Sequence, residues 1–143
     1  MPKLPQEQTS YSDPQYGVIH RSYFPFAAVD TDDVATAGTH AESFLALPVK
    51  AQIVGFGVLA ASVDVVMATS DGFELRTVNG TKLATWVADA DYTLGTGDAT
   101  SCAPETATAI AKNHGMVACV ATDTGVSGSV VYFVDWAAEY EAE

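Results

Sequence analysis

The sequence predicts an all-β protein, an antiparallel, jelly-roll-like β-sandwich with an extended N-terminal arm. Three observations lead to this prediction. Short apolar segments recur at close intervals between residues 17 and 136, turn residues separate them, and the periodicity of a long helix is missing. Such a series is typical of a sandwich or a barrel and not of alternating strands and helices. A chain of 143 residues is long enough for one domain with one core.

The arm comes first. Residues 1–16 contain Pro2, Pro5 and Pro14 among Gln, Ser and Asp side chains, and this composition buries too little apolar surface to fold alone. We therefore expect an arm at 1–16, a sandwich domain at 17–136 and an acidic tail at 137–143. The opening "MPKLPQEQTS" lacks the apolar core of a secretory signal, so we expect no export signal.

The next segment, "GVIHRSYFPFAAV", alternates imperfectly and contains Pro25. Because proline has no N–H to donate to a sheet, we predict an edge strand, or two short strands with a break at the proline. The following "DTDDVATAGTHAE", from Asp30 to Glu42, predicts a polar loop.

The most apolar stretch, "AQIVGFGVLAASVDVVMA", runs from Ala51 to Ala68 and is close in length to a membrane-spanning helix. Asp64 interrupts it, and Gly55 and Gly57 equally fit a kink in a strand. We expect strands here and no membrane partner.

The clearest local signal is "FELRTVNGTKLATW", in which Asn79 and Gly80 tolerate the positive φ angles of a type I′ hairpin turn. With a two-residue turn, Val78 pairs with Thr81. Phe73, Leu75 and Thr77 then share a face with Lys82, Ala84 and Trp86, unless a bulge shifts the register by one. A similar turn at Asp71-Gly72 would complete a three-stranded meander from about Val63 to Val87.

The charge balance excludes nucleic acid as a partner. Six Lys and Arg stand against eighteen Asp and Glu, a net charge of −12, so few side chains are available to neutralise phosphates. Charged residues make up only 17% of the chain, below the roughly 25% usual for soluble domains. We infer that part of the surface is covered by copies of the chain or by a partner.

No catalytic or metal-binding pattern stands out. "DTG" at Asp123 resembles half of a dimeric aspartic protease site, but a β-turn between two strands explains it better. The histidines are dispersed, and Asp30, Asp32, Asp33 and Glu42 offer at most a weak Ca²⁺ site. We expect no enzyme activity and no cofactor. Cys102 and Cys119 do not make a disulfide framework, so free thiols are the default and a single bridge is the alternative.

Aromatic residues gather near both ends of the chain. They can form one core edge where the termini meet, or an exposed surface that docks on a partner, since Tyr and Trp are enriched at interface hot spots. Trp136 and Tyr140 are four residues apart and would point the same way on one helical turn. The residues predicted to contact a partner are Tyr11, Tyr16, Trp136 and Tyr140.

The sequence resembles the β-sandwich decoration, or cement, proteins on the heads of tailed bacteriophages. The resemblance lies in "LPVKAQIVGFGV", in "SVDVVMATSDGFELRTVNGTKLATW" and in "DTGVSGSVVYFVDW", and it covers roughly Phe44 to Trp136. It implies a jelly-roll-like sandwich without catalysis, self-association that is often trimeric, and an arm that reaches over neighbouring capsid subunits. The major capsid protein would be the partner, and no functional residue carries over by motif.

Two functions follow as expectations. The first is a virion structural protein, a decoration subunit on the outer capsid surface that is assembled in the host cytoplasm and binds the major capsid protein and itself. The alternative is a carbohydrate- or receptor-binding module of a phage tail or fibre, which would use aromatics such as Trp86, Tyr92 or Trp136 against sugar faces.

Overall fold

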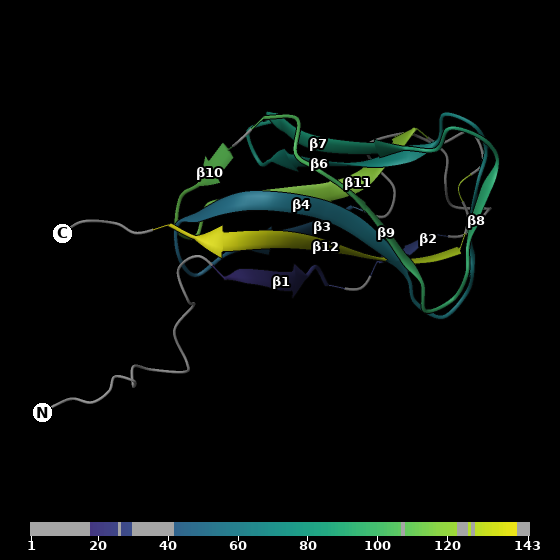
Figure 1. The fold of residues 1–143 in the computed structure, drawn as a ribbon, viewed down its shortest axis with the longest axis horizontal. Coiled ribbons are helices and arrows are strands. Elements are labelled where there is room, and N and C mark those ends of the chain that lie inside the picture. Colours follow the sequence, from purple (N-terminus) through teal and green to yellow (C-terminus); the bar gives the residue numbers. More distant parts are fainter. Residues whose placement is uncertain are drawn as a thin grey trace, which may run out of the picture.

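The computed structural model of this chain describes residues 18–25, 27–29, 42–106, 108–122, 126 and 128–139. Within these residues all regular secondary structure is β-strand, as predicted, and no helix is present. Figure 1 shows the strands, which are β1 (Ile19–Tyr23), β2 (Ala27–Val29), β3 (Ser43–Ala46), β4 (Ala51–Ala60), β5 (Val65–Met67), β6 (Gly72–Thr77), β7 (Lys82–Val87), β8 (Tyr92–Leu94), β9 (Ala99–Cys102), β10 (Thr108–Ile110), β11 (Gly115–Thr122) and β12 (Gly128–Ala138).

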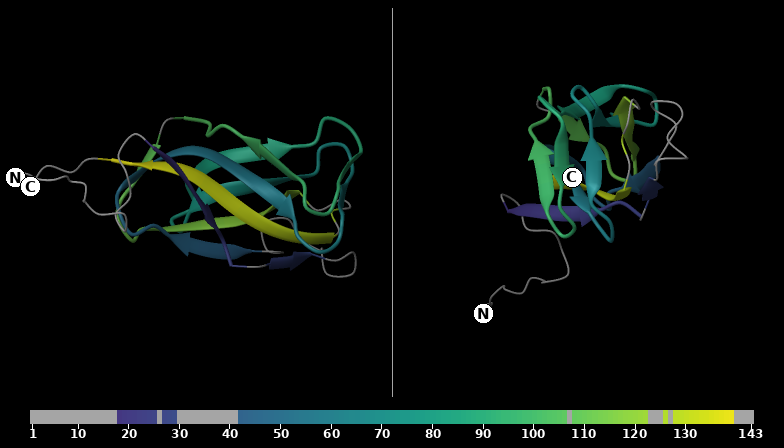
Figure 2. Two further views of the ribbon diagram at one scale, coloured as in Figure 1. Left: turned by 60° about the horizontal axis from the view of Figure 1, so that its bottom comes forward. Right: turned by 90° about the vertical axis from the view of Figure 1, so that its right-hand side faces the viewer.

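Most of these strands form two antiparallel sheets that pack face to face, so the predicted sandwich is confirmed. The first sheet has the order β1, β12, β4, β10, in which β2 also pairs with β12 and β9 also pairs with β4. The second sheet has the order β3, β11, β6, β7, and β5 pairs with β8 in a separate ribbon. Figure 2 shows the domain from two further sides, with its elongated shape in the left view and a view along its long dimension on the right.

The pairing order is that of a jelly roll. β1 and β2 act as one interrupted strand along β12, and β9 and β10 act as another along β4. With each of these counted once, the first strand pairs with the last, β3 pairs with β11, β4 pairs with β9 and β10, and β6 pairs with β7. A long hairpin that is rolled into two sheets has this nested order. The predicted jelly-roll-like topology is therefore present.

Tyr132 of β12 lies between the two sheets. Its ring stacks on Phe56 of β4, with 6.1 Å between centroids, and meets Phe73 of β6 edge-on at 5.7 Å. Since β4 belongs to the first sheet and β6 to the second, Tyr132 joins the two layers of the core. Burial of such large rings is a main source of stability for a domain of this size.

The hydroxyl of Tyr132 is an exception to the apolar core. It is buried and has no hydrogen-bond partner among the described residues. Loss of water around the hydroxyl raises the pKa of Tyr132 well above its ordinary value. A buried polar group without a partner reduces the free energy of unfolding, because its hydration is lost and not replaced.

Away from the turn, the hairpin between β6 and β7 has the predicted register, with Phe73 opposite Trp86 and Leu75 opposite Ala84. The turn is not type I′, because Gly80 has a positive φ of 99° and Asn79 does not. The Gly80 N–H donates to the Thr77 carbonyl, and a bulge follows in β7. The alternative with a bulge is therefore the one that forms.

The meander predicted from Val63 to Val87 is wrong. β5 pairs with β8 and not with β6, so Asp71-Gly72 does not join two paired strands. The turn lies one residue earlier, at Ser70, which has a positive φ of 76°, and the Asp71 carboxylate accepts the Ala68 N–H to close it. Gly72 is needed for a different reason, since a side chain there would collide with the backbone of Trp86.

The break at Pro25 is confirmed. β1 and β2 lie on either side of it along β12, and in the part of the chain that the structure describes no strand pairs with their outer edge. The Pro25 carbonyl accepts a hydrogen bond from the Ser43 hydroxyl at the start of β3, which connects the break to the second sheet.

The apolar stretch from Ala51 to Ala68 forms β4 and β5, with a bulge beside Val54. Among the residues described, none belongs to a helix of the length and hydrophobicity needed to span a membrane. The domain boundaries predicted at residues 16 and 136 stay predictions, because residues 1–17 and 140–143 lie outside the described residues. β12 itself continues to Ala138, two residues into the predicted tail.

Candidate interaction surface

The outer face of the first sheet carries an unusual set of side chains. Cross-strand pairing places Arg21 of β1 opposite Asp135 of β12, and Tyr23 opposite Phe133. On the other side of β12, Asp135 and Phe133 are opposite Gly55 and Gly57 of β4. Because side chains alternate between the two faces of a sheet, these residues all belong to the face that points away from the core.

Phe133 is on this outer face, yet it is only 1% exposed. The Arg21 guanidinium lies 3.9 Å from the centroid of its ring, and Tyr23 meets the ring edge-on at 5.9 Å. On the side of β4, the ring lies against Gly57 and occupies the space that a side chain at position 57 would fill. Phe133 therefore forms a small second core outside the sandwich, covered by β1.

Arg21 also makes a two-pronged ion pair with Asp135. Nε and Nη2 of Arg21 donate to the two carboxylate oxygens at 2.7 and 3.0 Å. The hydrogen bond to Asp135 raises the pKa of Arg21 above its ordinary value, so the guanidinium stays charged at any pH at which the protein is folded. A partly exposed pair of this kind contributes about 0.2–1 kcal/mol, so its main effect is to fix the position of Arg21 over Phe133.

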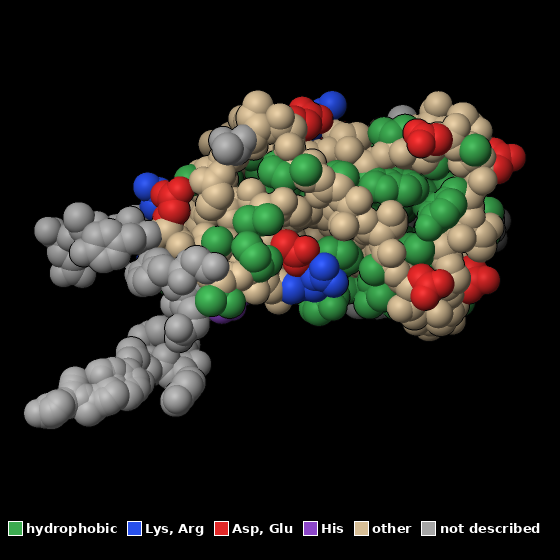
Figure 3. All heavy atoms as spheres, in the orientation of Figure 1, with side chains coloured by type: hydrophobic (Ala, Val, Ile, Leu, Met, Phe, Trp, Pro, Cys, Tyr) green, Lys and Arg blue, Asp and Glu red, His purple; other side chains and the backbone are tan. Residues whose placement is uncertain are grey.

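Exposed apolar side chains flank this pair. Ile19 and Tyr23 of β1 are about half exposed, and Val54, at the bulge in β4, is 41% exposed. We call Ile19, Arg21, Tyr23, Val54 and Asp135 the outer patch. Figure 3 shows this side of the molecule, with a group of charged side chains in its middle and hydrophobic side chains around it.

One end of the outer patch, at Ile19, lies where β1 begins beside the end of β12. Ile19 is the cross-strand partner of Ala137, so residues 1–17 and 140–143 connect to neighbouring strands at the same end of the first sheet. Three predicted contact residues, Tyr11, Tyr16 and Tyr140, belong to these flanking segments and lie outside the described residues.

The fourth predicted contact residue, Trp136, is placed differently from the sequence expectation. It belongs to β12 and not to a helical turn, and its side chain is 5% exposed on the inner face of the sheet. Its Nε1 donates to the Ser22 hydroxyl at 2.9 Å, and its ring packs against His20 with 4.8 Å between centroids. Trp136 thus completes the core where β1 and β12 pair, and its role in binding a partner stays a prediction.

Sequence reasoning did not select Ile19, Arg21 and Tyr23. The signal was present in "IHRSY", where these three residues alternate with His20 and Ser22. A strand with two large apolar residues on the face opposite to Trp136 indicates a sheet that is packed on both sides.

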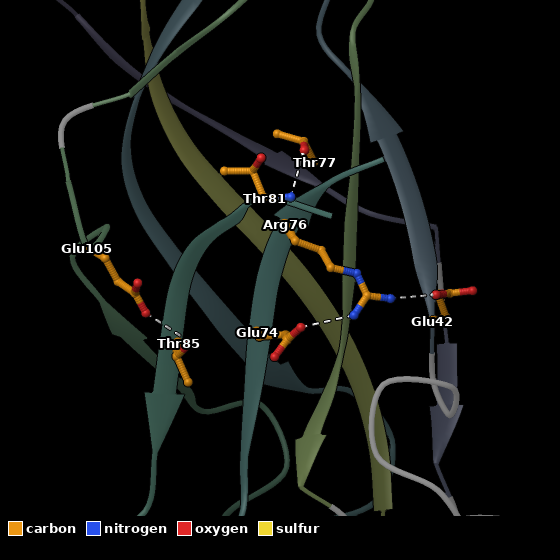
Figure 4. A network of polar contacts seen from close by, with 7 residues as sticks. All are labelled: Glu42, Glu74, Arg76, Thr77, Thr81, Thr85 and Glu105. Atoms are coloured by element: carbon orange, nitrogen blue, oxygen red, sulfur yellow. Dashed lines mark hydrogen bonds and ion pairs between the residues drawn. The ribbon is translucent and has the colours of Figure 1, made fainter. Parts of the chain in front are cut away.

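A second polar network lies on the outer face of the second sheet (Figure 4). Arg76 of β6 donates to Glu74 on its own strand at 2.9 Å and to Glu42, just before β3, at 3.1 Å. Beneath it, Cys119 of β11 is fully buried. Burial raises the pKa of the Cys119 thiol to about 11. These contacts fasten β3 and β6 across β11, so we assign the network a structural role.

The two thiols remain apart. Cys102 belongs to β9 in the first sheet and Cys119 to β11 in the second, and both are free. Partial burial raises the pKa of Cys102 as well. Free thiols, the default expectation, are confirmed.

One end of the sandwich has a hollow of about 270 Å³ lined by residues of β5 and β8 and the loops beside them. Tyr92, which is 40% exposed, forms part of its wall and packs against Trp86 with 5.8 Å between ring centroids. Asp91, also in the wall, accepts hydrogen bonds from the backbone and hydroxyl of Thr69. The hollow thus combines an aromatic face with a carboxylate.

Among the described residues no three His, Cys, Asp or Glu side chains are grouped to hold a metal ion. The weak Ca²⁺ site considered for Asp30, Asp32 and Asp33 falls in residues outside that part of the chain, as does Asp123, the residue of the protease hypothesis. Glu42, the fourth residue considered for Ca²⁺, is described and pairs with Arg76.

No protein-family model matches the chain, and no curated protein matches it. Two solved structures of infectious bursal disease virus show a remote likeness. A chain in the Gx strain structure shares 12% identity over 99% of this chain, with a TM-score of 0.30. A chain in the T13 viral particle shares 12% identity over 94% of this chain, with a TM-score of 0.25. This chain spans about two fifths of the length of either one, 39% and 40%. Likenesses at these TM-scores do not indicate a shared fold or function.

Proposed function

We propose that this chain is a virion structural protein, a decoration or cement subunit that lies on the outer capsid surface and binds the lattice of the major capsid protein. The observation that carries the proposal is the outer patch, a sheet face on which exposed Ile19 and Tyr23 flank the Arg21–Asp135 ion pair, and whose Ile19 end lies beside the point where residues 1–17 and 140–143 join the domain. A binding face next to two flanking segments suits a subunit that clamps several neighbours at once.

The fold supports this proposal at the level of analogy. Jelly rolls of two sheets occur in viral capsid domains, in lectins and in cupins, so the topology favours these classes without choosing among them. The low charged fraction of 17% also supports the proposal, because a surface with few charges is typical of one that is covered in an assembly. We further propose that assembly occurs in the host cytoplasm, that the subunit self-associates, as a trimer in the simplest case, and that it has no catalytic activity and binds neither nucleic acid nor membrane.

The proposal is tested with capsids that lack this protein. Wild-type chain should bind them at a fixed ratio, measured by light scattering and co-sedimentation. A chain without residues 1–16 should remain folded by circular dichroism and lose binding, and Tyr23→Ser should weaken binding at least tenfold. Phe44→Ser is the matched control, because Phe44 is equally exposed, at 57%, on the outer face of the second sheet. Full binding by both the truncated chain and Tyr23→Ser would exclude the outer patch and the arm.

The alternative function is a carbohydrate- or receptor-binding module of a tail or fibre. The hollow beside Tyr92 favours it, since sugars stack on exposed aromatic rings while a neighbouring carboxylate accepts their hydroxyl groups. Host polysaccharide should then change the fluorescence of Trp86, which contacts Tyr92, and Tyr92→Ala should abolish the change. A glycan array without hits, together with unchanged fluorescence, would exclude this alternative.

A further inference from the structure

Among the described residues, Lys side chains gather at one end of the sandwich and Asp side chains at the other. At one end the loops 47–50, 78–81 and 111–114 come together, because Val78 N–H donates to the Gly115 carbonyl and Asn113 N–H donates to the Leu47 carbonyl. Three of the five Lys and Arg residues that the structure describes are at this end, which we call the lysine end: Lys50, Lys82 and Lys112.

At the opposite end the loops 61–64, 68–71, 88–91 and 95–98 come together. Ser70 N–H donates to the Ala88 carbonyl, and Ala60 N–H donates to the Asp98 carbonyl. These loops carry exposed carboxylates and, among the described residues, no Lys or Arg. We call this the aspartate end; its exposed acidic residues are Asp64, Asp89, Asp91 and Asp98.

The charged side chains at the two ends differ in whether they already bind another group of the same chain. Lys82 and Lys112 are exposed, whereas Lys50 lies 3.4 Å from Glu139. Asp64 and Asp91 hold loops through hydrogen bonds to Thr96 and Thr69. The charges most available to a partner are therefore Lys82 and Lys112 at one end and Asp89 and Asp98 at the other.

Apolar groups accompany the charges at both ends. At the lysine end Val78, at the tip of the β6–β7 hairpin, is 51% exposed. At the aspartate end Val66 and Tyr92 are exposed and line the hollow of about 270 Å³. The β6–β7 hairpin lines a hollow of about 310 Å³ at the lysine end, so both ends are hollowed. The two ends are complementary in charge, with exposed apolar groups beside charges of opposite sign.

We propose that the lysine end of one copy binds the aspartate end of the next. The partner is a second copy because one chain presents both halves of the contact at opposite ends of its long dimension. A contact between two different surfaces of the same molecule is heterologous, so repetition gives a closed ring or an open filament, and not a two-fold dimer. This contact is separate from the outer patch and does not require a capsid.

Sedimentation velocity at low and at high salt tests the proposal with purified chain alone. Wild type should associate at low salt and dissociate at high salt, because ion pairs at an exposed contact are screened. Lys82→Glu with Lys112→Glu, and separately Asp89→Lys with Asp98→Lys, should each remain monomeric. An equimolar mixture of these two double variants should associate again, since each retains the end that the other has lost.

The two double variants control for each other. The first makes the acidic chain more acidic and the second makes it less acidic, so an effect of net charge alone would move their association in opposite directions. Circular dichroism and thermal melting establish that both are folded. A wild-type chain that stays monomeric at low salt, variants that still associate alone, or a folded mixture that does not associate would each overturn the proposal. Capsid binding by the variants is measured separately, so failure here leaves the proposed function standing.

Discussion

Phe133 and Gly57 face each other across β12 and β4, and the phenyl ring occupies the space where any other residue at position 57 would place its Cβ. The Thr100 carbonyl bounds the same space from β9. Gly57 is therefore required by the ring beside it and not by its own backbone conformation, which lies outside the left-handed region.

Gly57→Ala should lower the free energy of unfolding by about 1–3 kcal/mol, because the new methyl group forces Phe133 and Arg21 out of place. Chemical denaturation measures the change. Gly55→Ala is the matched control two residues earlier on the same face, where the nearest atom to the added methyl is the Cys102 carbonyl oxygen at 3.5 Å. That variant should differ from wild type by less than about 0.5 kcal/mol. Equal effects from the two substitutions would show that the ring does not depend on Gly57.

Tyr132→Phe should raise the free energy of unfolding by about 1 kcal/mol. The substitution keeps the ring contacts with Phe56 and Phe73 and removes a buried hydroxyl that has no partner among the described residues. Tyr92→Phe, at an exposed ring, should have little effect on stability and serves as the control. A loss of stability in Tyr132→Phe would mean that the hydroxyl is hydrogen-bonded in solution.

The two cysteines should differ in reactivity. The thiolate is the reactive form, and with a pKa of about 11 the Cys119 thiol is about one thousandth ionised at pH 8. In a Cys102→Ser chain, Cys119 should react with a thiol reagent only as fast as the protein unfolds. In a Cys119→Ser chain, half-buried Cys102 should react faster without denaturant. Rapid labelling of Cys119 in the folded protein would contradict the burial seen under Arg76.

Asp64 should titrate below its ordinary range. The Thr96 hydroxyl and backbone N–H both donate to Oδ1 at 2.7 Å, and these hydrogen bonds, that of the hydroxyl first, lower the pKa of Asp64. A lowered pKa means that the contact stabilises the loop above the unfolded pKa and is lost as the pH falls through the folded one. Carboxyl carbon NMR should place the midpoint below 3.8, the ordinary value. Thr96→Val should raise it, whereas Thr96→Ser, which keeps the hydroxyl, should not.

The sequence was most informative where local chemistry and strand pairing agree. "FELRTVNGTKLATW" contains two strands whose pairing partners are in the same segment, so its register followed from the turn, and only the bulge was open. Pro25 likewise acts through its own missing N–H, and the break it makes was predicted.

Prediction failed where the partner of a strand is distant. A turn signal closely follows β5 in the sequence, but the partner of β5 is β8, which is reached only after β6 and β7. The glycine that indicated a turn, Gly72, is needed instead for a close approach to Trp86. Trp136 was expected on a helical turn for a related reason. Nothing near it shows that β1, more than a hundred residues earlier, extends the sheet and pairs with β12 as far as Ala137.

The break at Pro25 has a consequence for the aggregation of this protein at high concentration. The unpaired edge strand of a sheet can pair with the edge strand of another molecule. When such pairing repeats from molecule to molecule, it leads to amyloid-like aggregates. Along the edge formed by β1 and β2, Pro25 offers no N–H, and the short strands on either side of it contain five and three residues. An incoming strand would find no continuous row of donors and acceptors. The interruption therefore works as a safeguard that keeps each molecule separate until a specific contact forms.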